Sequence, residues 1–517
     1  MNQNRNKLMI ASFLTLIAAG VGFATRGAAA PAWASQFNID GGTFGSIMGA
    51  GFAGFGVFIF FGGMLVEKFG YKKLLVLAVI LHMVSAAMLF VAPTMYEGWK
   101  EADTVTATAK VTDLLYWSVF LFAVCAGLYE AVINPLVGQL YPENQTHYLN
   151  ILHAGWPGGL IIGGILAAAF QNDTAWITEI PWHYALSAYS IVLIVLLGMC
   201  IPEPFPDTVS QSQGEKASYS YGVLFSCFAS IPFLFLILLH ALIGYMELGV
   251  DSWQTRLMEN LVENSVVVLI YTSFLMFALR FFAGPIVHRL NPIGLLFVSS
   301  VVAVLGLIWL GSEITSIVTI FAAATLYSLG KAFLWPTMLA VAGERYPQSG
   351  AIAMSALGAA GMLCVGFIGG EMIGAQQAMA TTSYLKENHE DIYDDYKAAD
   401  RTPYPSWMDN KLGVSVFEYQ QLDAQKQQEA MDNEEHKDNA SIKAAFDFGS
   451  RTSLTKTAMI PGAMAVGFFI LLGYYKSIGG YKVLSLDDEG ESEGGESTDG
   501  PSDVAANAGS AEGDGES

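Results

Sequence analysis

The sequence predicts an all-α polytopic membrane protein with twelve transmembrane helices in two pseudo-symmetric six-helix bundles. The first observation is composition: 53% of the 517 residues are hydrophobic and only 14% are charged, whereas soluble domains carry about 25% charged residues. The second is the recurrence of apolar runs close to the roughly 20 residues that a helix needs to cross the bilayer core. The third is that short patterns of the first half return, in the same order, in the second half.

The first six apolar runs predict an N-terminal bundle over residues 1–201. They cover Leu8–Ala30, Phe44–Leu65, Leu74–Ala92, Leu114–Gly138, Ala154–Phe170 and Tyr184–Ile201. The first run follows two bases and ends in small residues, as a cleaved signal does. Its apolar core is longer than that of a signal peptide, and Arg26 lies within it. We therefore interpret it as the first span.

The other six runs predict a C-terminal bundle over residues 223–476, after a polar linker at 202–222. They cover Val223–Val250, Val266–Val287, Ile293–Gly311, Ile317–Ala342, Ala351–Ala375 and Thr457–Tyr475. A polar insertion, 376–456, separates the last two spans, and its segment Phe417–Phe446 is predicted to be helical because it is rich in Gln, Glu, Ala and Lys. The acidic segment 477–517 is of low complexity and is predicted to be a disordered tail.

The net charge of −21 belongs mainly to these polar segments, since 485–517 contributes −11 and 376–456 contributes −6. It therefore says little about the solute. With a cytoplasmic N-terminus, inner segments carry ten Lys and Arg residues against three in the outer short loops. This positive-inside pattern predicts an integral protein of the plasma (inner) membrane with both termini in the cytoplasm.

Three sequence matches relate the two halves. Phe60–Lys68 and Phe281–Arg289 both read Phe-Phe-small-Gly, an apolar triplet, a polar residue and a base. Leu128–Pro135 parallels Leu329–Pro336, and glycines of the fifth span match glycines of the eleventh. Parallel repeats place a solute site at their interface, near the middle of the membrane.

The first of these matches resembles the signature loop of the major facilitator superfamily. The family pattern Gly-x-Leu-x-Asp-Arg-x-Gly-Arg-Lys stands here as Gly63-Met64-Leu65-Val66-Glu67-Lys68-Phe69-Gly70-Tyr71-Lys72-Lys73. The resemblance implies a gating loop, and the residues expected in it or in its counterpart are Gly63, Glu67, Lys68, Gly70, Lys72, Lys73 and Arg289. We expect Glu67 to cap a helix end and to pair with Lys72 or Lys73, although the same charges could simply set the topology.

A narrower resemblance joins spans four and five to the fucose–proton symporter family. Glu130-Ala131-Val132-Ile133-Asn134-Pro135, followed by Leu149-Asn150-Ile151-Leu152-His153 and Gly158, is similar to the family's Glu-x-x-x-Asn-Pro and Leu-Asn-x-x-Gln with a following Gly. The resemblance implies a sugar solute and a coupled proton. This sequence departs from the pattern at His153 and Trp156, and it has Arg26 in the span where the family carries an acid.

Ionisable residues inside spans predict the site, because a charge within the bilayer is retained where it lines a cavity or is paired. Spans one, four, seven and ten, which line the central cavity in the family, carry Arg26, Glu130, Glu247 and Lys331. We expect Arg26 to pair with Glu130, and Glu247 with Lys331, around one chamber; static packing pairs are the alternative. Polar and aromatic partners of the solute are predicted to be Asn134, His153 and Trp156.

Three further charges receive structural interpretations. We expect Asp251 to cap a helix end, Arg280 to extend to the inner surface or serve the gate, and Glu371 to be structural. No phosphate-binding Gly loop, zinc-spaced Cys/His cluster or nucleophile motif occurs in the sequence. We therefore expect no catalytic residue, metal or cofactor, and no nucleic-acid partner.

The predicted function is secondary active transport by alternating access, with ion-coupled uptake of a sugar or similar polyol. H⁺ or Na⁺ is the expected coupling ion, the bilayer is the other partner, and the chain is expected to be a monomer. Two alternatives stay open: transport of a charged or zwitterionic solute, and a transporter-like receptor that uses the insertion for interactions.

Overall fold

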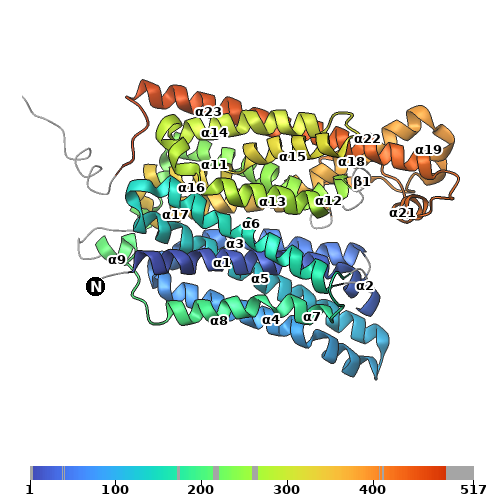
Figure 1. Ribbon diagram of the computed structural model, residues 1–517, viewed down its shortest axis with the longest axis horizontal. Coiled ribbons are helices and arrows are strands. Elements are labelled where there is room, and N and C mark those ends of the chain that lie inside the picture. Colours follow the sequence, from blue (N-terminus) through green and yellow to red (C-terminus); the bar gives the residue numbers. More distant parts are fainter. Residues whose placement is uncertain are drawn as a thin grey trace, which may run out of the picture.

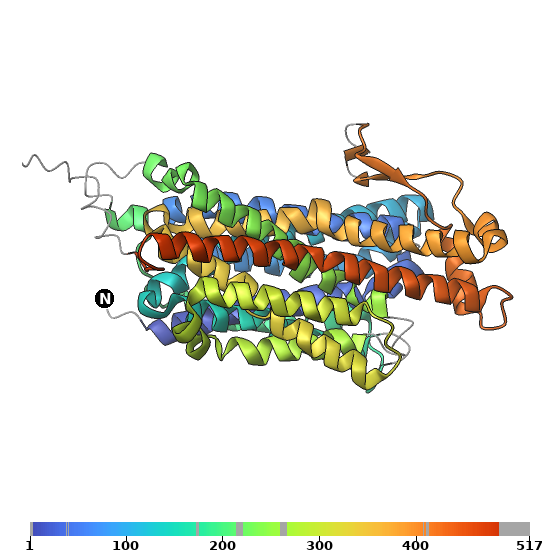
Figure 2. The same ribbon diagram turned by 90° about the horizontal axis from the view of Figure 1, so that it is seen from above.

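The computed structural model describes residues 4–37, 39, 41–171, 175–213, 221–258, 266–406, 408–409 and 413–484. Its long helices run side by side in two bundles, which lie one above the other in Figure 1 and are seen from above in Figure 2. The N-terminus and α9 (Val209–Gln213) lie at one end of the bundles, and α19 (Glu390–Tyr396) and α21 (Ala424–Asp432) at the other. These ends are named the terminal side and the insertion side.

The N-terminal bundle contains the first six spans. The side chain of Asn4 accepts a hydrogen bond from the Lys7 N–H, at 3.1 Å, and so caps the first helix. The spans are α1 (Arg5–Ala28), α3 (Gly41–Phe69), α4 (Tyr71–Lys100), α5 (Thr104–Leu140), α6 (Gln145–Phe170), and α7 (Trp182–Ser187) with α8 (Tyr189–Cys200). Two short elements connect them: α2 (Ala30–Phe37) follows α1, and η1 (Pro142–Asn144) precedes α6.

The C-terminal bundle follows α9, α10 (Tyr221–Leu224) and η2 (Ser226–Ala229). Its spans are α11 (Ile231–Gly244) with η3 (Tyr245–Gly249) and α12 (Val250–Met258), α13 (Val266–Arg280), α14 (Ala283–Leu310), α15 (Ile317–Lys331) with α16 (Leu334–Arg345), α17 (Gly350–Cys364) with η5 (Val365–Gly369) and α18 (Gly370–Asn388), and α22 (Asn439–Thr457) with α23 (Met459–Ser477). Between α16 and α17 lies η4 (Pro347–Ser349). The segments η3 and η5 are single π-helical turns, which commonly occur at functional positions.

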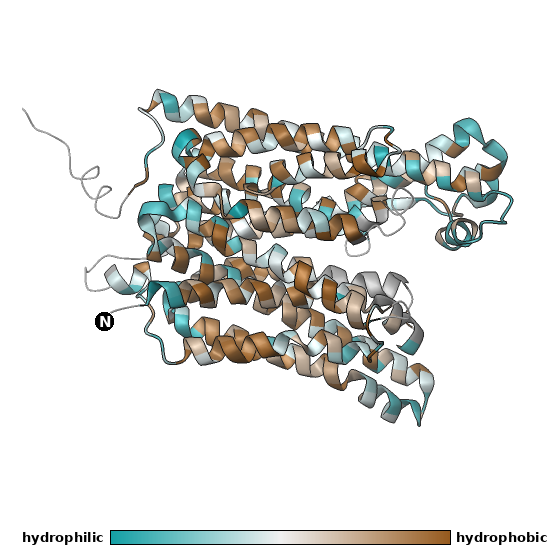
Figure 3. Cartoon of the chain, viewed as in Figure 1, coloured by the Kyte–Doolittle hydropathy of each residue, from teal (hydrophilic) through white to brown (hydrophobic). Residues whose placement is uncertain are grey.

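The surface of the bundles is that of a membrane protein. Ten helices in the described part of the chain are long and apolar enough to cross a bilayer, and Val267–Arg280 is a shorter apolar helix. Large apolar side chains such as Ile191 and Phe469 point outward and are 68% and 65% exposed. Figure 3 shows hydrophobic residues along the middle of the helices and hydrophilic residues in the insertion. The predicted all-α membrane fold of two bundles is therefore confirmed.

The backbone repeats between the halves at the predicted gating loops. Gly70, which separates α3 from α4, has φ 83°, and Asn291, where α14 bends, has φ 56°. These two residues stand at the same distance after Gly63 and Gly284, the matched glycines of the sequence repeat. A positive φ strains most side chains and favours Gly or Asn. The residue types at the two bends follow from this requirement.

The insertion differs in part from its prediction. Helices α18 and α22 extend beyond the predicted limits of 376 and 456. The strands β1 (Thr402–Tyr404) and β2 (Phe417–Tyr419) pair antiparallel, so the expected helix over Phe417–Phe446 is wrong at its start. Aromatic side chains favour strands, and the rings of Tyr404 and Phe417 stack with centroids 4.9 Å apart. The predicted disordered tail begins at 477, but residues 477–484 are described and the Tyr481 hydroxyl donates to Glu344 at 2.6 Å. Residues from 485 onward lie outside the described part of the chain.

Candidate functional site

A cavity of about 550 Å³ lies between the two bundles. Its walls come from α1, α3, α5 and α6 of the first half and from η3, α12, α13 and α17 of the second. All of these helices contribute residues from their insertion-side portions. The cavity also reaches the loop before α7, where the lining residue Trp176 is 67% exposed. It is large enough for a small-molecule ligand.

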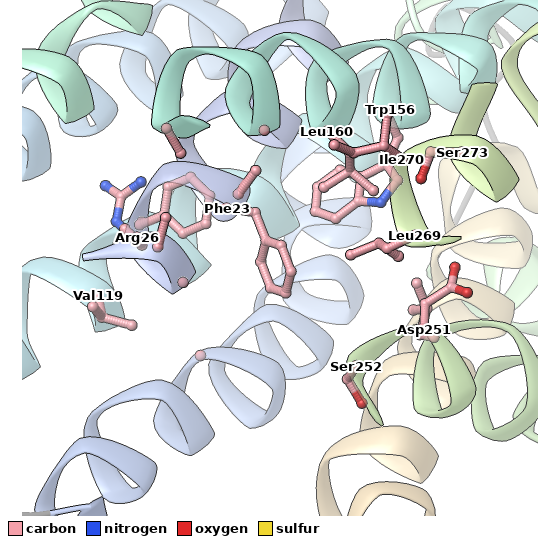
Figure 4. Close-up of a pocket in the computed structure, with 18 of the residues that line it drawn as sticks. Phe23, Arg26, Val119, Trp156, Leu160, Asp251, Ser252, Leu269, Ile270 and Ser273 are labelled. Carbon is pink, nitrogen blue, oxygen red and sulfur yellow. The ribbon is translucent and has the colours of Figure 1, made fainter. Parts of the chain in front are cut away.

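The cavity walls are mainly apolar and aromatic, with Phe23, Phe122, Trp156 and Leu160 among them. Among the described residues, two ionisable ones line the cavity, Arg26 from the first half and Asp251 from the second. Figure 4 shows them on opposite sides of the pocket, with the Arg26 guanidinium turned away from Asp251. Gln171, Ser252 and Ser273 add neutral polar groups.

Arg26 is held inside the N-terminal bundle. Its guanidinium donates to the Gly22 carbonyl at 2.8 Å, to the Ser85 hydroxyl at 3.1 Å and to the Tyr189 hydroxyl at 2.9 Å. It also lies over the Phe122 ring, 3.9 Å from the centroid. Its Nε has no hydrogen-bond partner, and no carboxylate of the described residues forms an ion pair with it. The expected Arg26–Glu130 pair is wrong, because the Arg26 side chain turns toward α4 and α8.

Glu130 forms a compact group with the other predicted residues of spans four and five. The Asn134 amide donates to Glu130 Oε2 at 2.6 Å, and His153 Nε2 lies 2.9 Å from Asn134 Oδ1 and 3.7 Å from Glu130 Oε2. All three side chains are buried. The spacing of Glu130 and Asn134 by one helical turn places them on the same face of α5. The structure therefore brings together three predicted residues, beneath the cavity rather than on its wall.

Arg280 connects this group to the C-terminal half. Its Nη1 donates to the carbonyl oxygen of His153 at 2.6 Å, its Nη2 to Glu247 Oε1 at 2.8 Å and its Nε to the Ala332 carbonyl at 2.7 Å. The side chain is buried. The expectation of a surface-directed Arg280 is wrong, because α13 ends at Arg280 between the two bundles.

The second pair of charges also differs from expectation. Glu247 pairs with Arg280, while Lys331 pairs with Asp251, so the predicted Glu247–Lys331 pair and the capping role of Asp251 are wrong. Glu247 and Asp251 lie four residues apart across η3 and α12, so both face the bases of neighbouring helices. The four-residue spacing from Glu247 is the feature of the sequence that could have indicated a buried, paired Asp251. No comparable spacing in the sequence indicated that Arg280 connects the two halves.

These residues form one buried charge cluster, defined here as Glu130, Glu247, Asp251, Arg280 and Lys331. Three carboxylates against two bases leave a formal charge of −1 when His153 is neutral. Buried charges are costly without compensation. A single proton on the cluster makes it neutral.

Of the seven predicted site residues, Arg26 and Trp156 line the cavity. Glu130, Asn134, His153, Glu247 and Lys331 are buried on its terminal side, in the cluster or against it. The sequence predicted that these charged residues surround one chamber. The structure instead has two regions, an apolar cavity and a polar layer on its terminal side. Asp251 belongs to both.

The predicted gating loop contacts the opposite half. The Glu67 carboxylate accepts hydrogen bonds from the Ala351 N–H at 2.8 Å and from the Ser210 N–H at 3.0 Å. It thus caps the first turn of α17, as the helix dipole favours. The expected pair with Lys72 or Lys73 is wrong, since Lys72 donates instead to the Glu203 carbonyl at 3.1 Å. Glu371 is structural, as expected: its carboxylate accepts from Ser406 of the insertion.

The other residues predicted for the gating loop include exposed bases and a glycine at a helix–helix contact. Lys68, Lys73 and Arg289 are exposed to solvent. A Cβ added to Gly63 would lie 2.5 Å from Ser355 Oγ, so the glycine permits α3 and α17 to touch across the two halves.

Further hydrogen bonds join the halves on the terminal side. The Thr146 hydroxyl donates to Glu344 at 2.8 Å, and the Asn150 amide to the Thr337 hydroxyl at 3.1 Å. The Gly284 N–H donates to His147 Nδ1 at 3.1 Å. Together with Glu67 and Arg280, these contacts close the space between the bundles beneath the cavity.

Solved structures share this fold. The proton:xylose symporter XylE, bound to 6-bromo-6-deoxy-D-glucose, is 12% identical with a TM-score of 0.61, over 90% of this chain and 95% of its own. FucP in its outward conformation is 15% identical with a TM-score of 0.58, over 90% and 98%. The human organic anion transporter MFSD10 is 12% identical with a TM-score of 0.57, over 90% and 100%.

Similarity in sequence is found at the level of the family. No curated protein matches the chain significantly. The family model of the Major Facilitator Superfamily matches residues 11–370, which is more than half of the chain. The chain is therefore a multi-pass membrane transporter that belongs to the major facilitator superfamily.

Proposed function

We propose that the protein is a secondary active transporter that moves one small solute by alternating access and couples this movement to protons. Its termini lie in the cytoplasm and its insertion outside the plasma (inner) membrane, in keeping with the positive charge of the segments on the terminal side. On this assignment the described conformation faces outward. The division into residues 1–201, 202–222, 223–476 and 477–517 follows the two moving halves and their connections.

One observation carries the proposal: a cavity between two helix bundles that side-chain and backbone hydrogen bonds close on its terminal side. Each of these bonds joins one half to the other, so separation of the halves at the terminal side breaks them together. Individual hydrogen bonds contribute about 1 kcal/mol each, so a few of them can be exchanged for contacts on the insertion side. The two arrangements can then interconvert.

The charge cluster supports proton coupling. With one proton the cluster is neutral and can stay in a dry layer, whereas loss of that proton leaves an unbalanced negative charge that favours contact with water. We assign the proton to Glu130, which accepts one hydrogen bond from Asn134 and lies near Arg280 without an ion pair to it. Glu247 and Asp251 each have a base at hydrogen-bonding distance and remain ionised.

A sugar or similar polyol is the first candidate for the solute. Trp156 lines the cavity with an aromatic ring, and Gln171, Ser252 and Ser273 supply neutral donors and acceptors. Two proteins with the same fold are the proton:xylose symporter XylE and the fucose:proton symporter FucP, which is consistent with this choice.

A charged or zwitterionic solute with an apolar body is the second candidate. It is favoured by the apolar walls and by Arg26, a buried cation with no carboxylate partner among the described residues. Arg26→Gln separates the candidates in an uptake screen of labelled sugars and organic acids. Transport of an anion should be abolished, and transport of a neutral sugar should be retained.

The coupling is tested with the purified protein in liposomes. Wild-type protein should concentrate a labelled solute when a pH gradient is imposed, and Glu130→Gln should lose this accumulation while it retains solute exchange. Glu143→Gln is the matched control, because Glu143 is an exposed carboxylate on the terminal side. Accumulation by Glu130→Gln at the wild-type level would remove Glu130 as the coupling group. Binding without any flux would favour the receptor alternative.

A further inference from the structure

The insertion and the ends of two spans enclose a second cavity of about 320 Å³. Trp253 of α12 forms one wall, and the face of α18 that carries Glu371 and Gln377 forms another. The strands β1 and β2 and helix α21 complete it from the insertion. Figure 1 shows these elements together at the insertion side. Its volume lies within the range of pockets for small ligands.

The walls of this cavity are fixed in place by the contacts between the insertion and α18. The Glu371 carboxylate accepts hydrogen bonds from the Ser406 N–H at 2.9 Å and from the Ser406 hydroxyl at 2.8 Å. The Tyr404 hydroxyl donates to the Ile368 carbonyl at 3.3 Å, within the π-helical turn η5. The insertion also has a small core of its own, which includes Leu385, Leu422 and Phe446. The cavity is therefore preformed.

The chemistry of the cavity differs from that of the central one. Among the described residues that line it, Glu371 carries the one carboxylate and none is Lys or Arg, and both carboxylate oxygens already accept hydrogen bonds from Ser406. The remaining polar side chains are neutral amides and hydroxyls, among them Thr402, Tyr419, Gln421 and Gln427. Such groups both donate and accept hydrogen bonds. They suit a solute that carries several hydroxyl groups and no charge.

Two aromatic residues complete this arrangement. Trp253 lies against α18 where Gly374 leaves room, since a Cβ on Gly374 would lie 2.6 Å from the Trp253 ring. Tyr419 faces the same cavity from β2. Within the described part of the chain, no hydrogen bond joins the Trp253 indole N–H or the Tyr419 hydroxyl to another residue, and both residues line the cavity. Aromatic rings with a polar edge pack against the apolar face of a sugar ring while they donate a hydrogen bond.

We propose that the insertion forms a second binding site, for a small neutral polyhydroxylated solute, between Trp253, Tyr419, Gln421 and Gln427. The site is separate from the central cavity but shares a helix with it, because Asp251 and Ser252 of α12 line the central cavity and Trp253 lines the second one. A solute bound there joins the insertion to the ends of α12 and α18. The binding itself does not depend on transport.

The test is hydrogen–deuterium exchange of the full-length protein in nanodiscs, with L-fucose, D-xylose and D-glucose as probes. At least one sugar should slow the exchange of amides between residues 402 and 427. Tyr419→Phe and Gln427→Ala should each raise the sugar concentration needed for half-maximal protection about fivefold, as expected for the loss of one hydrogen bond. Gln428→Ala is the control, because Gln428 is exposed on the same helix and bonds to Asp432.

A variant of the central cavity, Trp156→Ala, distinguishes this proposal from the proposed transport function. Protection of 402–427 should persist in that variant even when uptake is lost. The proposal is overturned if none of the three sugars protects this segment in the wild-type protein. It is equally overturned if the Tyr419→Phe/Gln427→Ala double variant is protected at the same concentration as the wild type, or if Trp156→Ala abolishes the protection.

Discussion

Arg280 Nη1 donates a 2.6 Å hydrogen bond to the carbonyl oxygen of His153, so one side chain of the C-terminal bundle holds the fifth span of the N-terminal bundle. The same guanidinium pairs with Glu247 and bonds to Ala332 in its own half. It therefore links the relative position of the bundles to the charge cluster. A change in the charge of the cluster therefore acts directly on the Arg280–His153 contact between the halves.

Arg280→Gln should destabilise the protein strongly, because it leaves the buried Glu247 carboxylate without its base. Loss of one partner of a buried pair costs about 3–5 kcal/mol. Thermal unfolding in detergent measures the effect. The double variant Arg280→Gln/Glu247→Gln removes both charges and should recover much of the lost stability; a double variant no more stable than the single one would contradict the pairing.

Lys331→Gln should behave in the same way through Asp251, which is its ion-pair partner. The single variant leaves a carboxylate at the cavity wall without a base, and Lys331→Gln/Asp251→Asn restores neutrality. We expect the midpoint of thermal unfolding to fall in the single variant and to rise again in the double. If Lys331→Gln is rescued by Glu247→Gln and not by Asp251→Asn, the observed pairing is wrong.

Glu67→Gln should favour opening of the terminal side. The carboxylate bonds to two backbone N–H groups, at Ser210 and at the start of α17, and its charge interacts favourably with the helix N-terminus by about 0.3–1 kcal/mol. We expect the amide variant to increase the reaction of a cysteine at the buried position Thr337 with a soluble maleimide about threefold, in a background without the four native cysteines.

The matched variant for this experiment is Lys68→Gln, which changes an exposed charge next to Glu67. It should leave the rate of cysteine modification unchanged. Equal rates in Glu67→Gln and in the wild type would show that this contact does not hold the terminal side closed.

Gly63→Ala should open the same side for a steric reason. The added methyl group would lie 2.5 Å from Ser355 Oγ and 2.7 Å from Ser355 Cβ, so α3 and α17 could no longer touch. Uptake should fall and the modification of a cysteine at Thr337 should rise. Ser355→Gly removes both clashing atoms, and the pair Gly63→Ala/Ser355→Gly should restore uptake; failure of the rescue would assign the defect to another contact.

The sequence by itself determined the membrane fold. Apolar runs of bilayer length, few charges and repeated motifs predict twelve spans in two bundles, because each span must satisfy its own backbone hydrogen bonds within the lipid. The repeat also matched equivalent positions in the two halves, and the structure has residues of positive φ, Gly70 and Asn291, seven residues after the matched glycines. The spans and the matched positions depend on the chemistry of residues that are close in sequence, so the order of residue types is enough to predict them.

The sequence also identified which spans carry buried charges, but only the tertiary structure decided how they pair. Glu247 and Asp251 lie on one helix within reach of Arg280 and Lys331, and Arg26 could have turned toward Glu130 instead of Ser85 and Tyr189. Likewise Glu67 bonds to Ala351, 284 residues away, rather than to the nearby lysines. The choice depends on the rotation and packing of each helix against its neighbours. Hydrophobic periodicity does not specify that rotation closely enough to select one ion pair among several.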